Sequence, residues 1–145
     1  MNANQTYIYY TDASYSYEQN CYSTAFTCNR FKQKEIFQAY FYHGDEVFKR
    51  IQSNGAEIMG VINVFNHIKE SKEEIKKAII YFDNYIVFHL IKGKTIPSNY
   101  IYLNYLYLFY ELRKVIEFRK VNPKDRQHKK VDKLAYRMMR INTVN

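Results

Sequence analysis

Three stretches near the start of the chain alternate apolar and polar residues or gather aromatic and β-branched residues, and both patterns are typical of β-strands. They cover residues 7–11, 22–28 and 36–42. The third ends at the turn signal His43-Gly44-Asp45. Because the connections between the stretches are short, we expect three strands in an antiparallel meander.

After the meander, the apolar residues follow a helical spacing. Residues 56–68 carry an apolar stripe, and Asn54-Gly55 precedes it as a cap and turn. Residues 78–82 form a continuous apolar run, as a buried parallel strand requires. The rest of the pattern predicts a short helix at 85–90, a long helix opened by Pro97-Ser98-Asn99 and ending at 113, a strand at 115–121 and a helix after Pro123.

This order of elements, β-β-β-α-β-α-α-β-α, predicts an α/β fold. A meander followed by crossovers through helices gives a mixed five-stranded sheet, with three antiparallel and then two parallel strands, flanked by helices. No internal repeat and no linker divides the chain, so we expect one domain over residues 1–145. The aromatic stripe of residues 100–110 covers most of its helix, which favours packing in the core over a surface for stacking bases.

Composition restricts the class of protein. With 47% apolar residues the chain is not disordered, and its net charge of +8 favours a polyanionic partner, although such a charge also aids solubility. Two cysteines are too few for a disulfide scaffold or a cysteine-rich zinc site. The start of the chain lacks a signal-peptide pattern, and no apolar run approaches the length of a membrane span. We therefore expect a cytoplasmic monomer without a membrane partner.

Four acidic residues occupy positions that suit a functional site. Asp12 and Asp83 come at the ends of two predicted strands, and sites in α/β sheets form outside the carboxyl ends of strands. Glu57 lies near the start of the first helix, in line with its apolar stripe, so it should face the sheet. Asp132 lies in the first turns of the last helix.

Carboxylates that cluster repel one another, and burial protonates them unless a cation balances their charge. Oxygen ligands of this kind suit Mg²⁺ or Mn²⁺. Two such ions about 3.5–4 Å apart stabilise the attacking and leaving oxygens of a phosphoryl displacement. Taken singly, each acid also has a plain structural explanation, as a turn former or as a charge that complements a helix dipole.

Short motifs around these acids resemble those of one family, type 1 ribonuclease H. Thr11-Asp12-Ala13-Ser14 resembles the family's Thr-Asp-Gly-Ser, and Phe82-Asp83-Asn84 resembles its Thr-Asp-Ser. Residues 53–60 resemble the helix start Asn-Asn-Arg-x-Glu-Leu-Met-Ala, and residues 131–135 resemble Ala-Asp-x-Leu-Ala. The four motifs occur in the family's order over almost the whole chain.

The resemblance implies a ribonuclease H-like fold and cleavage of the RNA strand of an RNA–DNA hybrid, leaving 5′-phosphate and 3′-hydroxyl ends. It implies that two Mg²⁺ (or Mn²⁺) ions are held by Asp12, Glu57, Asp83 and Asp132. Asp12 would bridge both ions, Glu57 and Asp83 would complete one site, and Asp132 would belong to the other. The candidate substrate-binding residues are Ser14, Ser53, Asn54, Asn84, Lys92 and Lys94.

The chain departs from the family at several positions. Ala13, Ser53 and Gly55 replace a glycine, an asparagine and an arginine, and residues 92–97 leave no room for a basic protrusion. The family's loop histidine has its nearest counterpart in His128, four residues before Asp132. His128 is either a proton shuttle or product-release aid, or a solvated residue at a helix start, and we favour the second.

Two alternative functions remain open from the sequence. A nuclease of the same fold could act on structured DNA or duplex RNA with the same acids. A non-catalytic nucleic-acid-binding module is the other alternative, but keeping four acids costs stability when no metal needs them.

Overall fold

The structure, a computed structural model, describes residues 5–143. Its elements are β1 (Thr6–Ser16), β2 (Cys21–Arg30), β3 (Ile36–His43), α1 (Glu46–Glu70), β4 (Lys77–Phe82), α2 (Ile86–Ile91), α3 (Tyr100–Leu112), β5 (Ile116–Lys120) and α4 (Arg126–Thr143). The strands form one sheet in the order β3-β2-β1-β4-β5. The pairs β1–β2 and β2–β3 are antiparallel, whereas β1–β4 and β4–β5 are parallel. The predicted mixed five-stranded sheet is confirmed.

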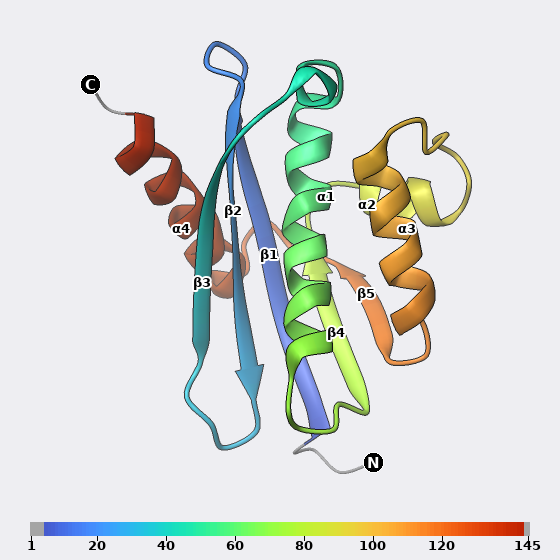
Figure 1. The fold of residues 1–145 in the computed structure, drawn as a ribbon. Helices are drawn as coiled ribbons and strands as arrows, with labels where there is room; N and C mark the ends of the chain where they lie inside the picture. Colours follow the sequence, from blue (N-terminus) through green and yellow to red (C-terminus); the bar gives the residue numbers. More distant parts are fainter. Residues whose placement is uncertain (1–4, 144–145) are drawn as a thin grey trace.

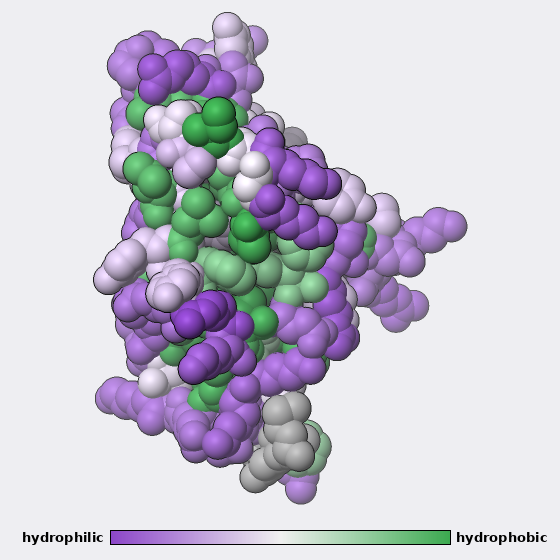
Figure 2. Space-filling model, turned by 90° about the vertical axis from the view of Figure 1, so that its right-hand side faces the viewer, coloured by the Kyte–Doolittle hydropathy of each residue, from purple (hydrophilic) through white to green (hydrophobic). Residues whose placement is uncertain are grey.

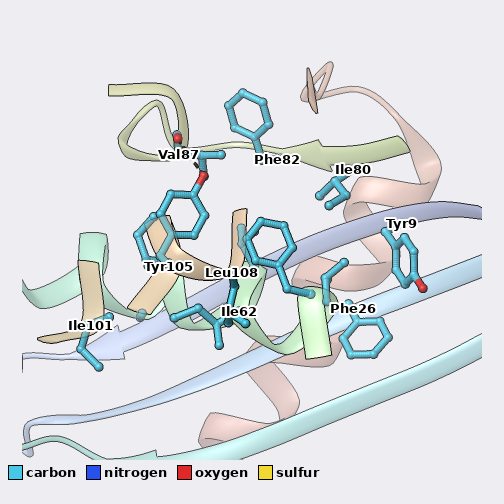
Figure 3. Packing of buried hydrophobic residues seen from close by; sticks show 14 of the residues in the cluster. Tyr9, Phe26, Ile62, Ile80, Phe82, Val87, Ile101, Tyr105 and Leu108 are labelled. Carbon is cyan, nitrogen blue, oxygen red and sulfur yellow. Dashed lines mark hydrogen bonds between the residues drawn. The ribbon is translucent and has the colours of Figure 1, made fainter. Parts of the chain in front are cut away.

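Helices cover both faces of the sheet (Figure 1). On one face α1 packs against β1 and β2 and α3 packs on α1, while α4 lies across β1, β2 and β3 on the other face. The main core lies between the sheet and α1 and α3 (Figure 3). The rings of Tyr9 and Phe26 contact His67 of α1, and the ring of Phe82 contacts Phe88 of α2. Tyr105 of α3 donates a hydrogen bond to the carbonyl of Val87 at 2.8 Å, which joins α3 to α2.

The first helix is longer than the apolar stripe predicts. It begins at Glu46 rather than at residue 56, because Asp45 caps it by accepting a hydrogen bond from the amide of Phe48. At Gln52 the backbone turns to φ 51° and ψ −127°, which kinks the helix. Asn54-Gly55 is therefore part of the helix, and its prediction as a cap and turn is wrong. A Cβ at position 55 would lie 2.6 Å from the side chain of Ile51, so the glycine serves packing across the kink.

The aromatic helix α3 begins at Tyr100. As predicted, Asn99 opens it, because the Asn99 side chain caps the helix by accepting a hydrogen bond from the amide of Tyr102. Tyr102, Tyr105 and Leu108 are buried, so the expected packing role is confirmed for this face of the helix. It is wrong for the opposite face, where four large side chains are more than half exposed: Tyr100, Leu103, Tyr107 and Tyr110. Apolar side chains gather on the face that carries α2 and α3, between hydrophilic margins (Figure 2). Within residues 5–143 no helix has the length and apolar composition to cross a bilayer.

Candidate active site

Asp12 lies inside β1, four residues before the strand ends, and not at its end as the sequence predicts. The strand is longer because its pairing with β2 continues to Ser16, opposite Cys21. Its parallel pairing with β4 stops at Tyr10, opposite Tyr81 (Figure 1). Asp12 therefore still lies just beyond the carboxyl end of the parallel pair, where a site is expected.

Glu57 reaches Asp12 from α1. One turn further along this helix, a Cβ at Gly60 would lie 2.9 Å from the Thr11 hydroxyl oxygen, so the glycine lets α1 lie close to β1. This close approach buries the Glu57 side chain to 8% exposure and Asp12 to 5%. The buried Oε2 atom of Glu57 has no hydrogen-bond partner among the described residues. Such an orphaned carboxylate oxygen is costly unless a cation or a proton satisfies it.

Burial also changes how these two acids hold protons. Burial, and after it the neighbouring Asp132 carboxyl, raise the pKa of Asp12 to about 6, while Glu57 and the Ala13 amide oppose the rise. Burial and then the negative charge of Asp12 raise the pKa of Glu57 well above its ordinary value. Without a bound cation, Glu57 therefore favours its protonated form.

Asp83 follows β4, as predicted. Its side chain is 47% exposed, so it is much more accessible to solvent than Asp12 or Glu57. It forms an ion pair with Lys120, whose Nζ lies 3.2 Å from Asp83 Oδ1. Lys120 is the last residue of β5 and pairs in register with Phe82, so the two strand ends bring it beside Asp83. The same ammonium lies 5.1 Å from the centre of the Tyr85 ring.

Asp132 lies on α4, and several contacts fix this helix on the sheet. Asp125 caps its start by accepting from the amide of Gln127, and the Tyr10 hydroxyl donates to the other carboxylate oxygen of Asp125 at 2.9 Å. The Ser23 hydroxyl donates to the carbonyl of Ala135 at 2.6 Å. With α4 held in this way, the exposed Asp132 lies beside Asp12, from which it is 120 residues distant in the chain.

The four acids thus come from β1, α1, the residue after β4, and α4, but they do not form a complete metal-binding site. Within residues 5–143 no three Asp, Glu, His or Cys side chains converge closely enough to hold an ion as they stand. Asp12 has Glu57 and Asp132 beside it, whereas Asp83 is engaged by Lys120. The donors fit a hard divalent cation, because all are carboxylates and one buried oxygen lacks a partner.

Two of the candidate substrate-binding residues are joined. Asn84 donates from Nδ2 to Oδ1 of Asn54 at 2.8 Å, and its own Oδ1 accepts from the amide of Ile86 at 3.0 Å. Ser53 is exposed directly before Asn54 on α1, and Ser14 lies half-buried on β1, two residues after Asp12.

The remaining candidates lie further along the chain. Lys92 and Lys94 are exposed at the end of α2, on either side of Gly93, which has a φ of 72°. His128 lies half-buried in the first turn of α4, one turn before Asp132, and its role stays a prediction. Lys120 was not predicted from the sequence, although its place at the end of the last predicted strand was a usable signal.

No protein-family model matches the chain, and no curated protein matches it significantly in sequence. Solved structures do match. The LC11 RNase H1, in complex with an RNA/DNA hybrid, has a TM-score of 0.74 at 10% identity, over 95% of this chain and 99% of that one. The N-terminal RNase H domain of a Mycobacterium tuberculosis protein has a TM-score of 0.66 at 17% identity, over 94% of both chains. RNase H1 from Halobacterium salinarum has a TM-score of 0.67 at 11% identity, over 92% and 97%.

Proposed function

Because the chain has the ribonuclease H fold, we propose that it is a metal-dependent endonuclease that hydrolyses the RNA strand of RNA–DNA hybrids. The observation that carries the proposal is the buried pair of Asp12 and Glu57, with Asp132 beside it and an orphaned oxygen on Glu57. A fold alone does not define an activity, but this arrangement of acids in this fold supplies the donors that the reaction needs.

The acids Asp12, Glu57, Asp83 and Asp132 would hold two Mg²⁺ or Mn²⁺ ions. When bound, such a pair of ions activates the attacking water and stabilises the leaving 3′ oxygen. Bound cations would compensate the negative charges of Asp12 and Glu57, whose burial otherwise favours their protonated forms. Asp12 lies beside both Glu57 and Asp132, which supports it as the residue that would serve both ions.

The substrate assignment has separate support. One structure of the same fold, the LC11 RNase H1, is a complex with an RNA/DNA hybrid. The net charge of +8 favours a nucleic acid as partner. At the edge of the acid cluster, Asn54 offers a side-chain amide suited to the 2′-hydroxyls and base edges of a minor groove. We expect the protein to act as a cytoplasmic monomer, and light scattering in solution tests the monomer.

The test is a cleavage assay on three end-labelled substrates of identical sequence: an RNA–DNA hybrid, a duplex RNA and a duplex DNA. We expect cleavage of the hybrid's RNA strand with Mg²⁺ or Mn²⁺, 5′-phosphate and 3′-hydroxyl ends on the products, and no cleavage in excess chelator. Glu57→Gln is the matched inactive control, because it keeps the shape and removes the charge. Equal cleavage of the hybrid and either duplex, or full activity of Glu57→Gln, contradicts the proposal.

A further inference from the structure

Lys120 is the basic side chain that lies directly against the acid cluster. It ends β5, whose register with β4 sets it opposite Phe82, so its side chain extends past the strand ends to the following residue, Asp83. The distance from Lys120 Nζ to Asp83 Oδ1 is 3.2 Å. The Tyr85 ring lies on its other side, with Nζ 5.1 Å from the ring centre, a spacing at which an aromatic ring attracts a cation.

This ion pair distinguishes Asp83 from the other three acids, although its charge still acts on Glu57. Asp12, Glu57 and Asp132 lie together, yet within residues 5–143 no three acids converge on one point. Asp83 is the acid whose partner is a lysine rather than another acid. The pair is 31% exposed at Lys120 and 47% exposed at Asp83, so water screens it, and such pairs are weak and open readily.

We propose that Lys120 is an internal counter-cation of this site, which holds Asp83 through its ion pair and competes with a divalent metal ion for that carboxylate. The inference rests on the proposed metal site. An ion that takes Asp83 as a ligand must displace the ammonium, and the displaced positive charge stays nearby because the Tyr85 ring holds it. Both effects weaken metal binding, so Lys120 raises the metal concentration at which the site loads. Lys120 is in this sense a positioning residue, because it acts through Asp83.

The test measures Mn²⁺ binding by isothermal titration calorimetry, on the full chain and without nucleic acid. We expect Lys120→Gln to bind Mn²⁺ about tenfold more tightly than the parent, because a unit charge a few ångströms from the ion is removed. Lys120→Arg keeps the charge and should bind as the parent does. Lys114→Gln is the control for net charge, since Lys114 precedes β5 at its opposite end and its loss should leave the affinity unchanged.

A double-mutant cycle separates competition for Asp83 from simple repulsion. In an Asp83→Asn background, the effect of Lys120→Gln should largely disappear, because the carboxylate over which lysine and metal compete is gone. Circular dichroism and thermal melting check that each variant is folded. Parent-like or weaker Mn²⁺ binding by Lys120→Gln overturns the proposal, and so does a gain of equal size in both backgrounds.

These results are distinguishable from a failure of the proposed function. A parent that cleaves hybrids while Lys120→Gln binds Mn²⁺ unchanged refutes the role of Lys120 and leaves the ribonuclease intact. A parent that cleaves no hybrid, but binds Mn²⁺ more tightly after Lys120→Gln, refutes the ribonuclease and supports the role of Lys120.

Discussion

The side chain of Asn84 fixes the orientation of the Asn54 amide. Oδ1 of Asn84 accepts from the backbone amide of Ile86 at 3.0 Å, and a backbone N–H can only donate. Nδ2 of Asn84 therefore faces Asn54 and donates to its Oδ1 at 2.8 Å. This leaves Nδ2 of Asn54 directed away from Asn84, so that Asn54 presents hydrogen-bond donors rather than an acceptor to a nucleic acid.

The first prediction follows from this orientation. Asn54→Ala should raise KM for the hybrid about tenfold with little change in kcat, because it removes a contact made equally in the ground and transition states. Asn84→Ala should cause a smaller rise, since Asn54 can then rotate but can still donate. Steady-state kinetics of both single variants and the double variant measure the coupling. If Asn84 acts through Asn54, the double variant equals Asn54→Ala, and additive effects refute the relationship.

The second prediction concerns Asp12 and pH. Because the pKa of Asp12 is raised to about 6 in the folded protein, from an ordinary value of 3.8, folding favours its protonated form. The stability that the protonated carboxyl contributes to the folded protein is fully present below about pH 4 and is lost as the pH rises through about 6. Asp12→Asn cannot ionise, so without metal it should be more stable than the parent at pH 7.5, by on the order of 2–3 kcal/mol.

Urea unfolding in excess chelator at pH 4 and pH 7.5 tests this. The advantage of Asp12→Asn should shrink toward zero at the lower pH, and a difference that is constant across this range would contradict the explanation. The test compares the variant with the parent at each pH. Carboxyls with lowered pKa, such as Glu35 and Asp45, stabilise the folded protein less as the pH falls, and they do so in both proteins. The same variant should lose hydrolysis.

The third prediction concerns the basic residues that we expect to contact the phosphate backbone. Lys92→Glu with Lys94→Glu should raise KM and flatten the dependence of KM on salt, with kcat nearly unchanged, since phosphate contacts position a duplex without doing chemistry. Lys32→Glu with Lys34→Glu, in the connection between β2 and β3, is the charge-matched control. A loss of kcat with an unaltered salt dependence would show that these residues act in another way.

A fourth prediction concerns His128. Its place in the first turn of α4, one turn before Asp132, limits its movement, so it cannot swing toward a substrate as a loop residue can. His128→Ala should therefore lower kcat only a few-fold. A loss of about 100-fold, together with a missing limb of the pH–rate profile near neutrality, would instead assign it general acid–base catalysis.

The kink in α1 gives a fifth prediction. Gln52 holds a positive φ of 51° with ψ −127°, a conformation that costs a residue with a side chain more than it costs glycine. Gln52→Gly should raise the free energy of unfolding by about 1 kcal/mol. Gln52→Ala keeps the strain and serves as the control for the lost side-chain hydrogen bond to the carbonyl of Lys49. A loss of stability in Gln52→Gly, relative to Gln52→Ala, would show that the position is unstrained.

The order of strands and helices could be predicted from the sequence, because the periodicity of hydrophobic residues and the turn residues are local properties of the chain. The start of α1 could not, since Asn54-Gly55 is a turn signal that packing against Ile51 overrides. The reach of β1 past Asp12 depends on its pairing with β2, and the ion pair of Lys120 depends on the register of β5 beside β4. Such long-range contacts have no local signature. The acids were found from their motifs, and the pairing of Asn54 with Asn84 only from the structure.

The contact between Asp12 and Asp132 joins the first strand to the last helix, and this has a consequence for protein synthesis. Every strand of the sheet lies before residue 121, so all residues of the sheet are synthesised before α4 is complete. At that stage three of the four acids are in place and the fourth is missing. A nascent chain can therefore reach most of its fold while the proposed metal site is incomplete, and docking of α4 would be the step that completes this site.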